Sequence, residues 1–128
     1  MITDLLNRWA QAEPGRCRSY QNDLSRAIMF EVLMTIHRSP QWVVVGSFAD
    51  RESMSGLALL QYALQQAVVA HNFWLRLEYS SGWKSIVLRD GGGVSFFPCE
   101  HDEEPAIALL KSYVSCLESK EARHGEGL

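Results

Sequence analysis

Apolar residues follow two different periods along this chain, and three segments show the spacing of an amphipathic helix. The clearest of these runs over residues 53–71. Its apolar and small positions recur every three or four residues: Gly56, Leu57, Leu60, Ala63, Leu64, Ala67 and Val68. Shorter patterns predict a helix over residues 4–12 and another over residues 103–119, the second capped by Asp102.

The segment Ile28–Ile36 contains good helix formers, yet its pattern favours a strand. On a helical wheel its apolar residues spread over the whole circumference, whereas a period of two separates two faces. One face then carries Ile28, Phe30, Val32, Met34 and Ile36. We therefore expect a strand here, with a helix as the alternative, after a helical turn near residues 20–26. A loop over residues 37–41 then leads into a strand over residues 42–45.

Three successive strands are expected between Phe73 and Pro98. Residues 73–79 and 83–89 flank Ser81-Gly82, a turn signal of hairpin length. A two-residue loop places Leu77 opposite Ile86, which gathers one apolar face: Phe73, Leu75, Leu77, Tyr79, Ile86 and Leu88. The glycines of residues 90–93 then form a second turn into a strand over residues 94–97. Because these glycines join two strands and no lysine follows, a turn is favoured over a phosphate-binding loop.

The opposite face of this sheet is more apolar than a solvent-facing surface usually is. In the expected register it mixes Trp74, Trp83, Val87, Val94 and Phe96 with Arg76, Glu78 and Arg89. Either the terminal helices or a partner must cover it. We therefore select six candidate protein-interaction residues: Trp74, Arg76, Trp83, Val87, Arg89 and Phe96.

Together these elements predict an α+β domain in the order α-β-β-α-β-β-β-α, with helices packed on an antiparallel sheet of about four to five strands. The 128 residues are 47% hydrophobic and 21% charged, which is typical of one globular domain. We assign it to residues 1–120, with a loose tail over residues 121–128.

The first residues lack the basic and apolar regions of a signal peptide, and no apolar run could span a bilayer. A cytoplasmic location is therefore expected.

Charge is distributed unevenly. The net charge is −3, and residues 99–128 carry seven acidic but only three basic residues. No basic stripe is present, which argues against nucleic acid as a partner. Nucleic-acid binding would have to use the arginines near the start of the chain: Arg8, Arg16, Arg18 and Arg26. The acidic end could face a basic protein partner, but a charge bias of this kind is more often only a solvated helix and tail.

Residues 99–104 form the densest group of possible ligands or catalytic groups. Cys99 and His101 could point the same way from an extended segment, but a structural zinc site needs about four ligands and no second pair stands at finger spacing. Cys99 with His101 or His71 could also form a nucleophile pair. We favour a polar connection whose acids cap the following helix, and we predict no catalytic residue, metal or cofactor.

The cysteines are three in number and widely separated, which argues against a disulfide framework. Cys17 lies between two arginines and is expected to be exposed. Cys99 is expected to behave as a small apolar residue at a strand end, and Cys116 as part of a helix core.

With a strand at Ile28–Ile36, the element order resembles that of the roadblock–longin group of small profilin-like domains. The resemblance covers about residues 20–117 and uses the helix ending near Ala70, the two strands after it and the turn at Gly91–Gly93. The glycine turn usual in the first hairpin is replaced by Ser39-Pro40. Type III secretion chaperones are similar in size and acidity, with an element order that fits less well. Either resemblance implies a non-enzymatic module that dimerises and docks other proteins.

We therefore expect a small protein-interaction module, an adaptor, chaperone or regulator that forms a homodimer. One alternative is an inhibitor or immunity-type protein that masks a basic site on its target. The other is an enzyme, or a binder of metal or a small ligand, that uses residues 99–104, with Cys99 and His101 as the candidate ligands.

Overall fold

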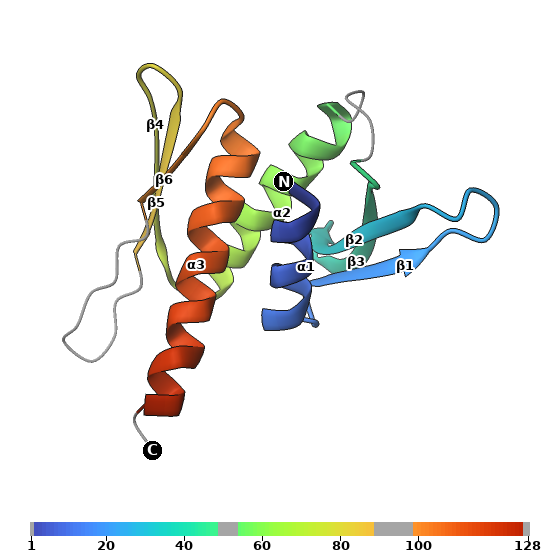
Figure 1. The fold of residues 1–128 in the computed structure, drawn as a ribbon, viewed down its shortest axis with the longest axis horizontal. Helices are drawn as coiled ribbons and strands as arrows, with labels where there is room; N and C mark the ends of the chain where they lie inside the picture. The colour runs from blue at the N-terminus through green and yellow to red at the C-terminus, as the bar shows by residue number, and fades with distance from the viewer. Residues whose placement is uncertain (1, 49–53, 89–98, 127–128) are drawn as a thin grey trace.

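Over residues 2–48, 54–88 and 99–126, which the computed structural model describes, the chain forms three helices and two antiparallel sheets of three strands each (Figure 1). The elements are α1 (Ile2–Ala12), β1 (Cys17–Gln21), β2 (Ile28–Ile36), β3 (Ser39–Gly46), α2 (Met54–Ala70), β4 (Trp74–Tyr79), β5 (Trp83–Leu88), β6 (Cys99–Asp102) and α3 (Pro105–Glu126). We name the sheet β1-β2-β3 sheet A and the sheet β4-β5-β6 sheet B.

The α+β class and the antiparallel pairing agree with the sequence-based prediction, but the strands are divided between two sheets. The expected single sheet of four to five strands is not seen in the described residues, and the order contains one additional strand. β6, at Cys99–Asp102, lies where a polar connection was expected, and the additional strand is β1, where a helical turn was expected near residues 20–26. Four of its five residues are exposed, so it carries no alternation of apolar and polar positions that would reveal it.

Sheet A confirms the strand at Ile28–Ile36, with Phe30, Val32 and Met34 buried on its inner face. The turn that follows is shorter than predicted. His37 and Arg38 both have positive φ, 50° and 65°, as a two-residue hairpin turn requires, so β3 begins at Ser39. Pro40 lies within β3, which is an edge strand and therefore tolerates a residue without an N–H group.

Helix α2 packs on sheet A with the face that its spacing predicts. Leu60, Ala63, Leu64 and Ala67 are buried. Gly56 approaches sheet A so closely that a Cβ atom there would overlap the carbonyl oxygen of Val45. The glycine therefore serves the contact between helix and sheet.

Sheet B shows that the predicted register is wrong by one residue. Its hairpin loop has three residues, 80–82, in place of two, so Tyr79 pairs with Trp83 and Leu77 with Ser85. The Ser80 N–H donates to the Gly82 carbonyl across this loop at 3.0 Å. The face that includes Ser85 consequently points to the core. The third strand, β6, pairs with β5; the predicted turn over residues 90–93 and strand over residues 94–97 lie outside the described residues.

A buried hydroxyl pair explains why a serine occupies the core face of β5. Ser85 and Ser112 are both fully buried, and their Oγ atoms lie 2.7 Å apart. The Ser112 hydroxyl also donates to the Leu109 carbonyl at 3.1 Å. Because each hydroxyl has a partner, burial costs little. The hydrophobic pattern alone favoured the register that keeps Ser85 out of the core.

Helix α3 is the central element. It contacts β5, β6, α2 and α1, and it passes between the two sheets in Figure 1. Its buried residues cover most of its circumference: Ala106, Ala108, Leu109, Leu110, Ser112, Tyr113, Val114, Cys116 and Leu117. Asp102 caps it as predicted, since its Oδ2 accepts the Glu104 N–H at 2.9 Å. The helix continues past Ser119 to Glu126, into the segment expected to be a loose tail.

Candidate functional site

The residues selected from sequence do not form one surface. Trp74 is 67% exposed and Arg76 is exposed beside it, on the face of sheet B that points away from α3. Val87 is fully buried and Trp83 half-buried, because the shifted register turns both towards α3. Arg89 and Phe96 lie outside the described residues.

The outer face of sheet B carries charges of both signs around Trp74. Alternation along the paired strands places these residues together on it: Trp74, Arg76 and Glu78 from β4, Lys84 and Ile86 from β5, and Cys99 and His101 from β6. Arg76 and Lys84 both form ion pairs with Glu78, the second at 3.4 Å. The result is an exposed tryptophan next to a row of partly neutralised charges.

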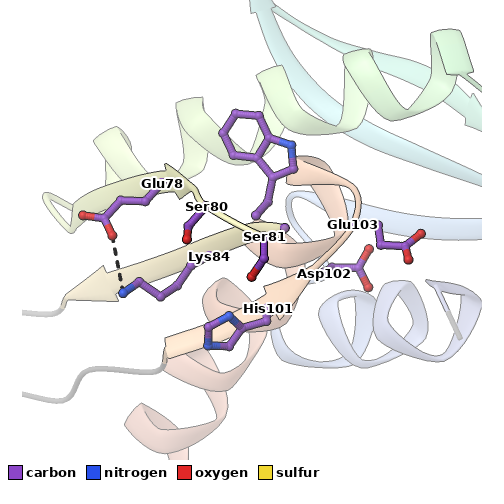
Figure 2. Close-up of a pocket in the computed structure, with 9 residues that line it drawn as sticks. Glu78, Ser80, Ser81, Lys84, His101, Asp102 and Glu103 are labelled. Carbon is purple, nitrogen blue, oxygen red and sulfur yellow. Dashed lines mark ion pairs between the residues drawn. The ribbon is translucent and has the colours of Figure 1, made fainter.

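A shallow pocket of about 340 Å³ lies where this face meets the β4–β5 loop (Figure 2). Its lining comes from the ends of three strands: Glu78, Ser80, Ser81, Gly82, Trp83, Lys84, His101, Asp102 and Glu103. The Lys84–Glu78 ion pair spans one side. Asp102 is engaged by the Glu104 N–H and by Lys111 Nζ at 3.2 Å. Asp102 therefore caps α3 as the sequence predicted, but Cys99–Asp102 is a strand where a polar connection was expected.

Cys99 and His101 share a face of β6, as their spacing predicted. Their cross-strand neighbours on β5 are Ile86 and Lys84, neither of which is a usual metal ligand. Among the described residues, no group of three or more His, Cys, Asp or Glu side chains is placed to hold a metal ion. His71, the other proposed base, instead bonds to Glu13.

Sequence reasoning missed a polar cluster centred on Glu13, at the end of α1. One carboxylate oxygen, Oε1, accepts the Trp9 indole N–H at 2.9 Å and the Tyr113 hydroxyl at 2.6 Å. The other, Oε2, lies 2.5 Å from His71 Nε2 and 3.7 Å from Arg16 Nε. Glu13 thereby links α1, α3 and the end of α2. Such contacts join positions up to 100 apart in the chain, so no local pattern could indicate them.

Two buried groups near Glu13 are held in their neutral forms. Burial, and secondarily the Glu13 charge, raises the pKa of the Cys17 thiol to about 12. The same two causes, in the same order, raise the pKa of Tyr113. The expectation that Cys17 is exposed is wrong, because Cys17 is buried; Cys99, expected at a strand end, is the first residue of β6 and is exposed. Cys17 lies inside because it starts β1 beneath α1, where its Sγ lies 3.7 Å from the Leu6 carbonyl oxygen.

The arginines near the start of the chain are largely engaged with acids. Arg8 pairs with Glu118, Arg16 with Glu13 and Arg18 with Glu31. Arg18 also lies over the Trp42 ring, 3.9 Å from its centroid. These contacts neutralise much of the positive charge that nucleic-acid binding would need.

The most unusual surface belongs to α2. The helix has no charged residue and no histidine in 17 positions, although part of it faces solvent. Leu59, Tyr62 and Val69 are 36%, 50% and 73% exposed, and their spacing places them on one side of the helix. We name these three residues the α2 outer stripe. A surface helix normally places charged residues on its solvent side, so this uncharged stripe is the strongest candidate for a contact surface.

A groove of about 410 Å³ adjoins the α2 outer stripe. It lies between α2 and the end of β2, and its lining is Arg16, Thr35, Tyr62, Gln65, Gln66, Val69 and Ala70. Of the described residues in that lining, Arg16 and the Tyr62 phenol are the ionisable groups. The described part of the lining is therefore mainly apolar and amide, with one cation.

In the part of the chain that the structure describes, no helix is both long enough and apolar enough to cross a membrane. Comparison of the chain with protein-family models, curated proteins and solved structures finds no match.

Proposed function

We propose that this protein is a small, non-enzymatic protein-interaction module that acts as an adaptor, chaperone or regulator. The observation that carries the proposal is the uncharged helix α2 with its exposed outer stripe. Surface helices ordinarily place charged residues on the solvent side. Covering the exposed parts of these three side chains would contribute on the order of 1 kcal/mol each.

A charge placed on the α2 outer stripe tests this proposal. Val69→Asp should leave the thermal midpoint nearly unchanged, because Val69 is 73% exposed, but should abolish retention of a partner from native lysate. The matched control is Leu24→Asp, in the loop between β1 and β2, where the leucine is 97% exposed. Mass spectrometry of the co-purified proteins reads the result. Equal retention by Val69→Asp and Leu24→Asp would refute a role for the stripe.

A homodimer is the second part of the proposal, and it is supported by the outer face of sheet B. An isologous interface brings each residue close to its own copy or to a fixed neighbour across the twofold axis. Trp74 next to Arg76, Glu78 and Lys84 offers an apolar centre with both charge signs, which can pair across such an axis.

Light scattering at micromolar concentration tests the dimer. The expected mass is twice the chain mass of 14.5 kDa, and Trp74→Lys should return it to one chain mass. Tyr20→Lys, at a 38% exposed aromatic residue on sheet A, is the control. A strictly monomeric wild type would refute the dimer while leaving the role of the α2 outer stripe open to its own test.

A cytoplasmic location belongs to the same proposal. Cys17, Cys99 and Cys116 all lie in the described residues and form no disulfide, which suits a reducing compartment. The resemblance to roadblock–longin domains supports a docking role, although the observed order has one strand more than the order on which that resemblance was based.

A further inference from the structure

Strand β2 extends beyond the strand that pairs with it. β1 pairs with β2 over Ile28–Val32, and one more bond follows, from the Leu33 N–H to the Arg16 carbonyl at 2.9 Å. β2 itself continues to Ile36. β1 cannot follow because the chain turns between α1 and β1, where the Glu13 carbonyl accepts the N–H groups of Arg16 and Cys17.

Thr35 is the next residue on this open side of β2. Residues two apart in a strand direct their backbone N–H and C=O groups to the same side, so those of Thr35 point the same way as those of Leu33. Both groups are bonded by one side chain. The Thr35 N–H donates to Gln66 Oε1 at 2.8 Å, and Gln66 Nε2 donates to the Thr35 carbonyl at 3.0 Å.

This pair of bonds is the one that a residue on a neighbouring antiparallel strand would make. The Gln66 amide has the same donor and acceptor as a peptide group, and it reaches the strand from α2. Gln66 therefore occupies a position that fits the backbone of an extended segment. The backbone of a helical partner could not supply these bonds, because its own N–H and C=O groups are already paired, whereas the backbone of an extended segment has them free.

The groove beside Thr35 determines which extended segment would fit. Tyr62 and Val69 of the α2 outer stripe line it, and so does Arg16. Within residues 2–48, 54–88 and 99–126, Arg16 has one carboxylate contact, to Glu13 at 3.7 Å, which is a long ion pair. Among the described residues no acid lines the groove, so an apolar side chain against Tyr62 and an acidic one towards Arg16 are favoured.

We propose that the open edge of β2 at Thr35 is a docking site for a short, extended, acidic segment of a partner protein, and that Gln66 holds the site until the segment displaces it. This inference rests on the proposed function, since the same segment would cover Tyr62 and Val69 of the α2 outer stripe. It adds a named backbone contact and the chemistry of the partner.

Selection of linear peptides from a random phage-displayed library against the immobilised full chain would test the site. The selected peptide, synthesised with a fluorescent label, is titrated against wild type and variants by anisotropy. Gln66→Ala should bind it about tenfold more tightly, because the peptide no longer competes with the amide. Thr35→Pro, which removes the N–H donor, should bind it at least tenfold more weakly. Arg16→Glu should weaken binding by a similar factor for peptides that contain an acid.

A measurement on the wild type does not depend on any variant folding. Nitrogen-15 NMR should show that the peptide shifts the Thr35 amide and the Gln66 side-chain amide before other signals. Failure of the library to yield a binder, unmoved Thr35 and Gln66 signals, or weaker binding by Gln66→Ala would each overturn the proposal.

Rejection of strand docking at Thr35 would leave the proposed function open. A partner lost with Val69→Asp yet retained by Gln66→Ala and Thr35→Pro at wild-type level would support the stripe and reject strand docking. Concentration-dependent shifts of Thr35 and Gln66 without peptide would identify a second copy as the occupant and overturn the choice of a partner segment.

Discussion

At the scale of single residues, Glu13 shows how one carboxylate can hold several elements together. Trp9, His71 and Tyr113 each direct a polar group to it from a different part of the chain. Removing the carboxylate would leave these part-buried groups without a partner, which costs more than the bonds themselves contribute.

Glu13→Ala should therefore lower the free energy of unfolding by about 2–4 kcal/mol. Urea denaturation followed by circular dichroism measures the change. The control is Glu118→Ala, which breaks the ion pair between Arg8 and Glu118, side chains that are 45% and 40% exposed. Solvent screening limits that loss to less than about 1 kcal/mol. A Glu13→Ala loss no larger than the control would show that water replaces the carboxylate.

The same control pair has a defined pH dependence. The hydrogen bond from Arg8 lowers the pKa of the Glu118 carboxyl. Its stabilising effect is therefore present above the unfolded-state pKa and is lost as the pH falls through the lower folded-state pKa. The stability difference between wild type and Glu118→Ala should shrink on acidification below the ordinary carboxyl range. A difference that grew towards acid pH would contradict the assignment.

Cys17 and Cys99 should differ in their reactivity towards alkylating reagents, because only Cys17 is buried. Cys99 is exposed, whereas Cys17 is fully buried with its pKa raised to about 12, so its thiolate is absent at neutral pH. Iodoacetamide at pH 8 should modify Cys99 first and leave Cys17 intact until the protein unfolds. Mass spectrometry of peptides after timed quenching reads the order. Modification of Cys17 at the rate of Cys99 would place Cys17 at the surface.

At the scale of elements, apolar periodicity predicted the strand at Ile28–Ile36 and the buried face of α2. It failed where polar residues occupy structured positions. β1 is a mostly exposed strand, and Ser85 is a buried serine whose hydroxyl is paired with that of Ser112. Neither feature produces a regular spacing of apolar and polar residues in the sequence. Both are explained only by the contacts that these residues make in the folded protein. The sequence also shows that α2 contains no charged residue. The apolar spacing of the helix predicts its buried face but not the exposed α2 outer stripe.

Helix α2 also provides a test of close packing. Gly56→Ala would favour an isolated helix by about 1 kcal/mol. In this protein it should instead lower the free energy of unfolding by about 1–3 kcal/mol, because the added Cβ would overlap the Val45 carbonyl oxygen. Gly15→Ala is the control, since a Cβ there would meet nothing within 4 Å. Stabilisation by Gly56→Ala would mean that α2 can move away from β3 at little cost.

At the scale of the whole molecule, α3 makes two small sheets into one structure. A three-stranded sheet exposes an apolar face that must be covered. Sheet B packs directly on α3. Sheet A packs on α1 and α2, and these two helices in turn contact α3. The functional surfaces proposed above, on α2 and on sheet B, therefore lie on elements whose relative positions depend on one helix.

This dependence predicts that the two sheets unfold together. Leu110 is fully buried in α3, so Leu110→Ala should lower the free energy of unfolding by about 2–5 kcal/mol. Amide hydrogen exchange should show the same loss of protection in β2 and in β5, because both sheets open only when α3 leaves. The control is Ala58→Gly on the exposed side of α2, which should cost about 1 kcal/mol. If Leu110→Ala increased exchange in β5 and left β2 unchanged, sheet B would be a separate folding unit, and a partner bound to α2 could not influence its outer face through α3.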